Sequence, residues 1–243
     1  MIGIGTIVNI AAIIIGSLIG MIFKGGLKQR FQDNIMNALG LAVMFIGISG
    51  ALQGLLIIKD SNIESTNIIL MIISLAIGAF VGELIDIEEK LERLGMKFKN
   101  IFKLKKGRGQ NFVEGFVTSS LLFCVGAMAI TGALQDGLIG DPTTLLAKSF
   151  LDGIAAIIFT STLGIGVMFS VIPLGLYQGG ITISAKYLEP FLNETLKMNI
   201  SFIGSILIFA IGINMVFGKK IKCGNLLPAI LIPIIYEIFI KII

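Results

Sequence analysis

A lysine and an aspartate lie four residues apart inside a long apolar run. In "GDPTTLLAKSFLDG", residues 140–153, Lys148 and Asp152 would share one face of a helix. A charge at the bilayer centre costs between about 3 and about 15 kcal/mol, so such residues usually face a bundle interior or water. Asp152 could therefore bind or relay a cation or proton, with Lys148 as its internal counter-ion. The alternative is a static ion pair that locks helices together.

The start of this segment sets the depth of the pair. Asp141 followed by Pro142 is typical of an N-cap and a first helical residue at the outer surface. At about 1.5 Å per residue, Asp152 would lie about 15 Å deep, near the midplane, with Lys148 one turn shallower. The lysine can extend its ammonium group toward water, whereas the aspartate cannot easily do so.

Further polar residues complete the predicted path for a substrate or an ion. They lie beside the pair, within other apolar segments or at their outer turns: Ser149, Asn9, Gln135, Asn214 and Glu237. Hydrogen bonding between helices explains the two asparagines equally well, and a turn explains the glutamine equally well. Glu83 and Glu114, at helix ends near the inner basic loop, are more simply explained by interfacial salt bridges.

The sequence offers little for catalysis. It contains no histidine, the commonest general base and metal ligand. The usual motifs of hydrolases, zinc proteases and nucleotide-binding proteins are absent from any usable context. Cys124 and Cys223 form no C-x-x-C pair. We therefore expect no enzymatic activity, no cofactor and no metal site.

Composition places the chain in a membrane. Of 243 residues, 55% are hydrophobic and only 14% are charged, with a mean hydropathy of +0.97. A bilayer core about 30 Å thick needs about 20 apolar residues per helix. Eight such stretches predict an all-α, polytopic bundle that forms a single integral membrane domain over residues 1–243. The predicted spans are residues 4–23, 35–58, 68–87, 112–134, 143–165, 167–187, 199–218 and 226–242.

The basic residues between the spans predict the orientation. With the N-terminus outside, fourteen of the 19 Lys and Arg fall in inner loops and four fall outside. Because basic loops stay cytoplasmic, both termini are predicted to lie outside. Returning "GKKIK" to the cytoplasm then requires two spans within residues 150–185. We expect a hinge at Gly164 and Gly166, and a break of the sixth span at Pro173 and at "QGG", residues 178–180.

The one sizeable soluble element is the basic loop at residues 86–110. Its apolar residues recur every three or four positions with charges between them, which is typical of an amphipathic helix on the inner membrane surface. A nucleic-acid patch is the weaker interpretation, because topology alone requires a basic loop there.

Two pairs of short motifs indicate an internal repeat. They are "ISGALQG" (48–54) with "ITGALQDG" (130–137), and "GSLIG" (16–20) with "GAFVG" (78–82). The helix pair at residues 4–58 would thus be repeated in residues 68–134, before the C-terminal helices at 143–242. Each unit carries a small-xxx-small face for close helix packing. Such repeats are typical of transporters.

The segment "LQDGLIGDPTTLLAKSFLDGIAAIIFTSTLGIGV", residues 134–167, resembles the YqgA/YdfK-type family of bacterial integral membrane proteins, which carries a domain of unknown function through its whole length. "GTIVN" near the start, "GELI" (82–85) and "CGNLLPAILI" (223–232) agree with it. The resemblance implies a multi-pass protein of the bacterial cytoplasmic (inner) membrane. It implies no particular reaction.

These observations favour a transporter or channel for a small solute or ion, with a polar path past Asp152 and Lys148. The alternative is a non-transporting partner or sensor protein that acts through its basic loop, and a membrane enzyme ranks third. The expected partners are the lipid bilayer and a small-molecule or ion substrate, with no nucleic acid. The small-xxx-small faces also suggest a homo-oligomer.

Overall fold

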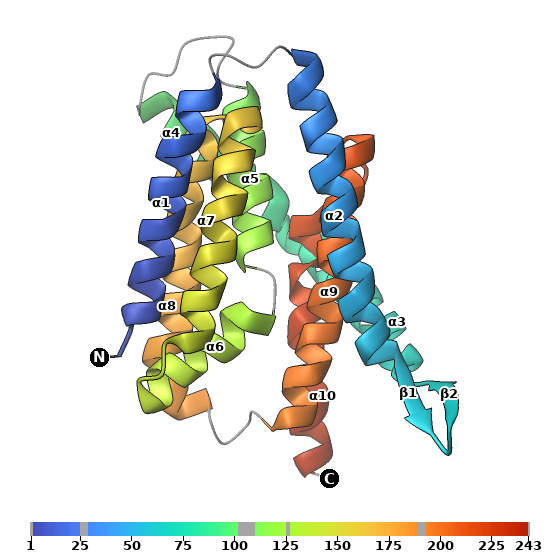
Figure 1. The fold of residues 1–243 in the computed structure, drawn as a ribbon. Coiled ribbons are helices and arrows are strands. Elements are labelled where there is room, and N and C mark those ends of the chain that lie inside the picture. Colours follow the sequence, from blue (N-terminus) through green and yellow to red (C-terminus); the bar gives the residue numbers. More distant parts are fainter. Residues whose placement is uncertain (1, 25–28, 102–109, 125–126, 189–192, 243) are drawn as a thin grey trace. The chain divides into compact units, whose positions relative to one another are not determined.

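The apolar stretches form helices in the computed structural model, which describes residues 2–24, 29–101, 110–124, 127–188 and 193–242. Among these residues, six helices are long and apolar enough to cross a bilayer. They are α1 (Ile4–Lys24), α2 (Gln29–Leu55), α3 (Ile68–Ile85), α7 (Thr143–Leu163), α8 (Val171–Leu188) with the preceding 3-10 helix η1 (Ile165–Ser170), and α9 (Glu194–Phe217) (Figure 1). An all-α membrane protein is the result, as the composition predicts.

The other two predicted spans differ from single straight helices. The fourth is divided between α5 (Gln110–Cys124) and α6 (Ala127–Ile139), whose axes lie at 75° to each other. The eighth begins as a 3-10 helix, η3 (Cys223–Leu231), and continues as the short α10 (Ile232–Ile242). Pro228 lies inside η3, where its missing N–H group is incompatible with a regular α-helix. Eight complete crossings and the positions of the termini therefore stay predictions.

The second predicted span ends earlier than expected. Residues 56–58 belong to strand β1 (Leu56–Lys59), which pairs antiparallel with β2 (Asn62–Ser65), and Ile58 faces Ile63. Asp60 and Ser61 form the two-residue turn, and both have positive φ angles. Two successive left-handed residues match the twist of a tight hairpin, so the polar turn sequence decides against further helix here.

The expected break within the sixth span is wrong. Helix α8 runs without interruption through Pro173 and the two glycines that follow Gln178. Pro173 is the third residue of the helix, where an N–H group has no intrahelical acceptor to lose. The irregular part is η1 instead. It follows Gly164, whose φ of 86° ends α7 and confirms the predicted hinge at that residue.

The N-cap of α7 lies one residue later than predicted. The carbonyl of Pro142 accepts the first helical hydrogen bond, from the N–H group of Leu146, so Pro142 is the cap residue. The Asp141 carboxylate accepts bonds from the backbone N–H and the hydroxyl of Thr143, at 3.0 and 2.6 Å. These bonds hold the pKa of Asp141 below its usual range. Asp141 thus still stabilises the start of the helix.

The basic loop forms the predicted helix over α4 (Ile87–Ile101), and residues 102–109 lie outside the described residues. The Phe98 ring packs against Phe116 and Phe169, with centroid distances of 5.9 and 5.8 Å. Part of the apolar face of α4 is therefore covered by neighbouring helices. Attachment of this helix to the membrane surface stays a prediction.

The described helices divide into two compact units. Unit 1 comprises residues 1–38, 89–124 and 128–189. It contains α1, most of α4, and α5 to α8. Helices α1 and α7 lie side by side (Figure 1). A Cβ atom on Gly16 would overlap the carbonyl oxygen of Gly153, and one on Gly20 would overlap that of Ile157. The first small-xxx-small motif therefore brings two backbones into contact.

Unit 2 comprises residues 39–88, 125–127 and 190–243. Here Gly78 and Gly82 of α3 pack against the backbone of Ala229 and Asn225 in η3, again too closely for a Cβ atom. Both small-xxx-small motifs thus serve close packing. The ancestral repeat that they suggest stays a prediction, because similar packing also arises without common descent.

We predict that Gly16→Ala destabilises the protein, because its methyl group would overlap the Gly153 carbonyl. Overpacking of this kind costs about 1–3 kcal/mol. Thermal unfolding in detergent measures the effect. Gly179→Ala is the matched control, because nothing lies within 4 Å of a Cβ atom there. Equal melting temperatures for the two variants would contradict the packing described.

Candidate functional site

Asp152 lies in a buried polar cluster formed by α1, α7 and α8 of unit 1. Its Oδ2 accepts hydrogen bonds from the Lys148 ammonium and, at 3.0 Å, from the amide nitrogen of Asn9. The same Asn9 nitrogen lies 3.3 Å from Oε1 of Gln178 on α8. Asp152 is only 8% exposed, and the other three residues are equally or more deeply buried. The structure thus brings together three of the predicted site residues and adds Gln178.

The hydrogen-bonding capacity of the Asp152 carboxylate is only partly used, although Lys148 balances its charge. Both donors address the same oxygen, and no donor among the described residues is bonded to Oδ1. The Lys148 ammonium lies 6.0 Å from the centroid of the Phe123 ring, a cation–π distance that stabilises the lysine separately. Asp152 therefore retains one carboxylate oxygen that can accept a proton, a cation or a donor group of a solute.

Several buried polar atoms around this cluster have no hydrogen-bond partner within the described part of the chain. Two belong to the cluster itself: Oδ1 of Asn9 and Nε2 of Gln178. Two more are the hydroxyls of Thr6 on α1 and Thr182 on α8. Leaving a buried polar group unpaired costs about 1–3 kcal/mol. These are four of the eight such atoms among the described residues, and they lie on two contacting helices, where a polar guest would complete their bonding.

The two threonines extend the cluster toward one end of unit 1. Thr6 precedes Asn9 by three residues and Thr182 follows Gln178 by four, so each is one turn away on the same helix face. The N-terminal end of α1 and the C-terminal end of α8 lie at the same end of the unit (Figure 1). We call this set the polar column: Thr6, Asn9, Asp152, Gln178 and Thr182. In the predicted orientation it leads from the outer surface to mid-membrane.

Asp136 of α6 closes the N-terminal end of α1. Its two carboxylate oxygens accept the N–H groups of Gly3 and Gly5, at 3.1 and 3.0 Å. A buried carboxylate at a helix N-terminus compensates both the unpaired N–H groups and the helix dipole. Sequence reasoning selected the neighbouring Gln135 instead. The signal that was missed is a charged residue in the same apolar segment.

Two predicted residues of unit 1 do not join the column. The hydroxyl of Ser149 donates to the carbonyl of Leu145 on its own helix, at 2.6 Å. Gln135 is exposed, and its Oε1 accepts the hydroxyl of Thr144 at 2.6 Å. Local bonding accounts for both side chains.

The remaining predicted residues, Asn214 and Glu237, belong to unit 2. Oδ1 of Asn214 accepts the N–H groups of Lys220 and Ile221, both at 2.9 Å, so this amide closes the turn after α9. Oε1 of Glu237 accepts the amide of Asn193. The partners of both residues thus lie within unit 2. Within the described residues, no group of three or more His, Cys, Asp or Glu could hold a metal ion.

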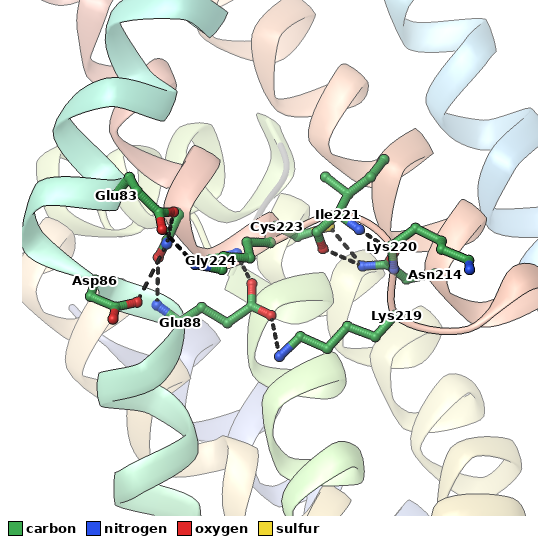
Figure 2. Close-up of polar contacts among 11 residues, drawn as sticks. Glu83, Asp86, Glu88, Asn214, Lys219, Lys220, Ile221, Cys223 and Gly224 are labelled. Carbon is green, nitrogen blue, oxygen red and sulfur yellow. Dashed lines mark hydrogen bonds and ion pairs between the residues drawn. The ribbon is translucent and has the colours of Figure 1, made fainter.

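A second polar network lies where α3 turns into α4, and we call it the α3–α4 corner (residues 83–88 with 219–225; Figure 2). Glu88 is 4% exposed. Its carboxylate accepts the N–H group of Gly224 at 2.9 Å and pairs with Lys219 at 2.8 Å. Its own N–H group donates to Oδ1 of Asn225, at 2.8 Å. Glu88 therefore fastens the start of α4 to the start of η3.

Glu83 completes the corner and confirms the salt bridge predicted for it, whereas Glu114 makes no ion pair among the described residues. It pairs with Lys222 and accepts the amide of Asn225, at 2.5 and 2.8 Å. The hydrogen bond to Glu83 raises the pKa of Lys222, so this lysine stays charged at neutral pH. The ion pairs and hydrogen bonds of the corner together hold the end of α3 and the start of α4 against η3, and we call this arrangement a structural clamp.

We predict that Glu88→Ala lowers stability, because it leaves the buried N–H group of Gly224 without an acceptor. The expected loss is about 1–3 kcal/mol. Glu89→Ala is the control, because among the described residues the Glu89 side chain makes only an exposed pair with Arg93, and such pairs contribute about 0–1 kcal/mol. Thermal unfolding in detergent measures the stability of both variants. A Glu88→Ala protein as stable as Glu89→Ala would contradict the structural role of Glu88.

Comparison with known proteins agrees with this membrane architecture. Residues 4–238 match the family described as "Protein of unknown function (DUF554)". The chain is 40% identical over 229 residues to the uncharacterized membrane protein YdfK of Bacillus subtilis (strain 168), covering 94% of this chain and 93% of that protein. It is 31% identical over 231 residues to the uncharacterized protein YqgA of Escherichia coli (strain K12), covering 94% of each.

No solved structure gives a significant match. The family match and both relatives extend over nearly the whole chain, which confirms the resemblance inferred from residues 134–167. This membrane protein belongs to the DUF554 family.

Proposed function

We propose that this protein transports a small solute or ion across the bacterial cytoplasmic membrane, and that the substrate passes through the polar column of unit 1. The observation that carries the proposal is the half-bonded Asp152 carboxylate beside partnerless polar atoms of Asn9 and Gln178. A purely structural cluster would be expected to use all of its donors and acceptors.

The charges favour a cation, a proton or a solute with hydrogen-bond donors at Asp152. Lys148 neutralises the carboxylate when no guest is present. A cation or proton that binds Asp152 competes with this ammonium group, which could then move outward along its flexible stem. The Asp152 carboxylate would therefore bind the Lys148 ammonium and the substrate alternately.

The position of the column also favours transport, because its polar side chains follow one another along the packed helices α1, α7 and α8. Ionisable residues inside a membrane bundle, such as Asp152 here, often mark substrate or ion pathways. Thr6 and Thr182 provide hydroxyls one turn outward from the Asn9–Gln178 contact, so a guest would exchange one set of partners for the next. We infer a single route of this kind, from the outer end of unit 1 to mid-membrane.

We predict that Asp152→Asn lowers flux into proteoliposomes, under an imposed proton or cation gradient, by about tenfold or more. The physical reason is that a hydrogen bond to a charged group is worth about 1.5–3 kcal/mol. Asp141→Asn is the matched control, because Asp141 is half-buried at the start of α7 and, within the described residues, its side chain bonds only Thr143. Equal flux through wild-type and Asp152→Asn protein would refute the role of this residue.

We predict that Thr182→Val lowers flux without lowering stability. The hydroxyl of Thr182 has no partner among the described residues, so a methyl group of the same shape removes an unpaired polar group. Loss of one substrate contact worth about 1 kcal/mol would reduce flux about fivefold. Thr118→Val on α5, outside the column, serves as the control.

Melting temperature and flux are measured on the same preparations. A Thr182→Val protein that transports like the wild type would exclude Thr182 from the path. A large fall in melting temperature would instead indicate a structural role for its hydroxyl.

The alternative of a partner or sensor protein depends on the basic loop. The packing of Phe98 on Phe116 and Phe169 gives α4 a structural use within unit 1, which favours transport. Wild-type protein without flux for any tested ion or solute, together with a phenotype that requires the basic residues of α4, would favour the alternative. Enzymatic activity and a nucleic-acid partner remain unexpected, and a homo-oligomer is part of the proposal.

A further inference from the structure

Unit 2 contains a cleft at the start of α3, and none of its lining residues belongs to the polar column. Its volume is about 490 Å³, within the usual range for small-molecule sites. The first turn of α3 forms one wall, Asn199 of α9 lies at another, and Ile232 and Tyr236 come from the C-terminal segment. In the predicted orientation this end of α3 lies at the outer face of the membrane.

The helix terminus that opens into this cleft is uncapped. Asn67 has a φ of 57°, and its side chain makes no capping bond. Its amide nitrogen donates instead to the carbonyl of Gly54, at 3.0 Å. The first hydrogen bond of the helix runs from the N–H group of Met71 to the Asn67 carbonyl. The N–H groups of residues 68–70 thus have no intrahelical acceptor and carry the positive end of the helix dipole.

Asn199 is an independent indication of a ligand. It lines the cleft and is 9% exposed. Within the residues that the structure describes, its side chain makes no hydrogen bond, and its polar atoms are not among those that are fully buried without a partner. A polar group in the cleft would therefore stabilise this mostly buried amide by hydrogen bonding. The helix terminus and the amide together offer donors to an anion.

The remainder of the cleft is apolar. Ile69, Ile73 and Tyr236 line it and are each at least partly exposed. Isoleucine side chains suit an acyl chain, and tyrosine is typical of the level at which lipid headgroups meet hydrocarbon. A free inorganic anion would leave this apolar surface unused. The combination fits a molecule with an anionic head and a hydrocarbon tail.

We propose that this cleft binds an anionic lipid of the outer leaflet. Its phosphate or carboxylate head accepts hydrogen bonds from the first turn of α3 and from Asn199, and a tail lies along Ile73 and Tyr236. Anion binding at a helix N-terminus requires no basic side chain, because backbone N–H groups and the dipole supply the attraction.

Native mass spectrometry in a non-ionic detergent tests the proposal with two probes that share their tails, dioleoylphosphatidate and dioleoylglycerol. The wild-type protein should bind the phosphatidate about tenfold more tightly, because hydrogen bonds to a charged group are stronger than those to a neutral one. Asn199→Leu should remove most of this preference. Its melting temperature should be unchanged, because Asn199 makes no bond within the described residues.

Asn100→Leu is the matched control, because Asn100 is exposed on α4. Ile73→Trp provides a second variant that fills the apolar part of the cleft and should weaken both probes. Equal affinity of the wild type for the two probes, or equal behaviour of Asn199→Leu and Asn100→Leu, would overturn the proposal. Displacement of phosphatidate by inorganic phosphate at comparable concentration would show a free-anion site and would overturn the lipid assignment.

Discussion

A carboxylate in the hydrocarbon region has to be compensated, and unit 1 is built so that two helices compensate Asp152. Lys148 supplies a countercharge from the preceding turn of α7, and Asn9 supplies a hydrogen bond from α1. Removing an ion of this kind from water costs several kcal/mol, even after relaxation. The packing of α1 against α7 is therefore a condition for tolerating the buried Asp152.

That packing depends on glycine. Lipid chains are as apolar as leucine, so helices in a bilayer associate by close contact and polar bonds rather than by the hydrophobic effect. Gly16 and Gly20 let the backbone of α1 approach that of α7 at Gly153 and Ile157. The same approach places Asn9 within 3.0 Å of Asp152. Small residues and the polar cluster thus belong to one helix contact.

The two polar networks differ in how completely they are bonded, and this difference separates a structural role from a candidate functional one. At the α3–α4 corner, both carboxylate oxygens of Glu88 have partners, in Gly224 and Lys219. Both polar atoms of the Asn225 amide are also bonded, to Glu88 and Glu83. In the polar column, by contrast, Asn9 and Gln178 each keep a buried atom without a partner. Unpaired groups do not stabilise a fold. Their presence on contacting helices is the strongest reason to expect a guest there.

Local patterns in the sequence determined the membrane class, six of the apolar helices, the close helix contacts of the small-xxx-small motifs and the ion pair of Lys148 with Asp152. Each depends on residues within a few turns of one another, where hydropathy and helical spacing are sufficient. Only the tertiary structure decided that Gln178, expected to break a helix, faces Asn9, and that Asp136 closes the start of α1. Hydropathy does not specify which helices become neighbours, because a lipid-facing side and a packed side of a membrane helix can be equally apolar.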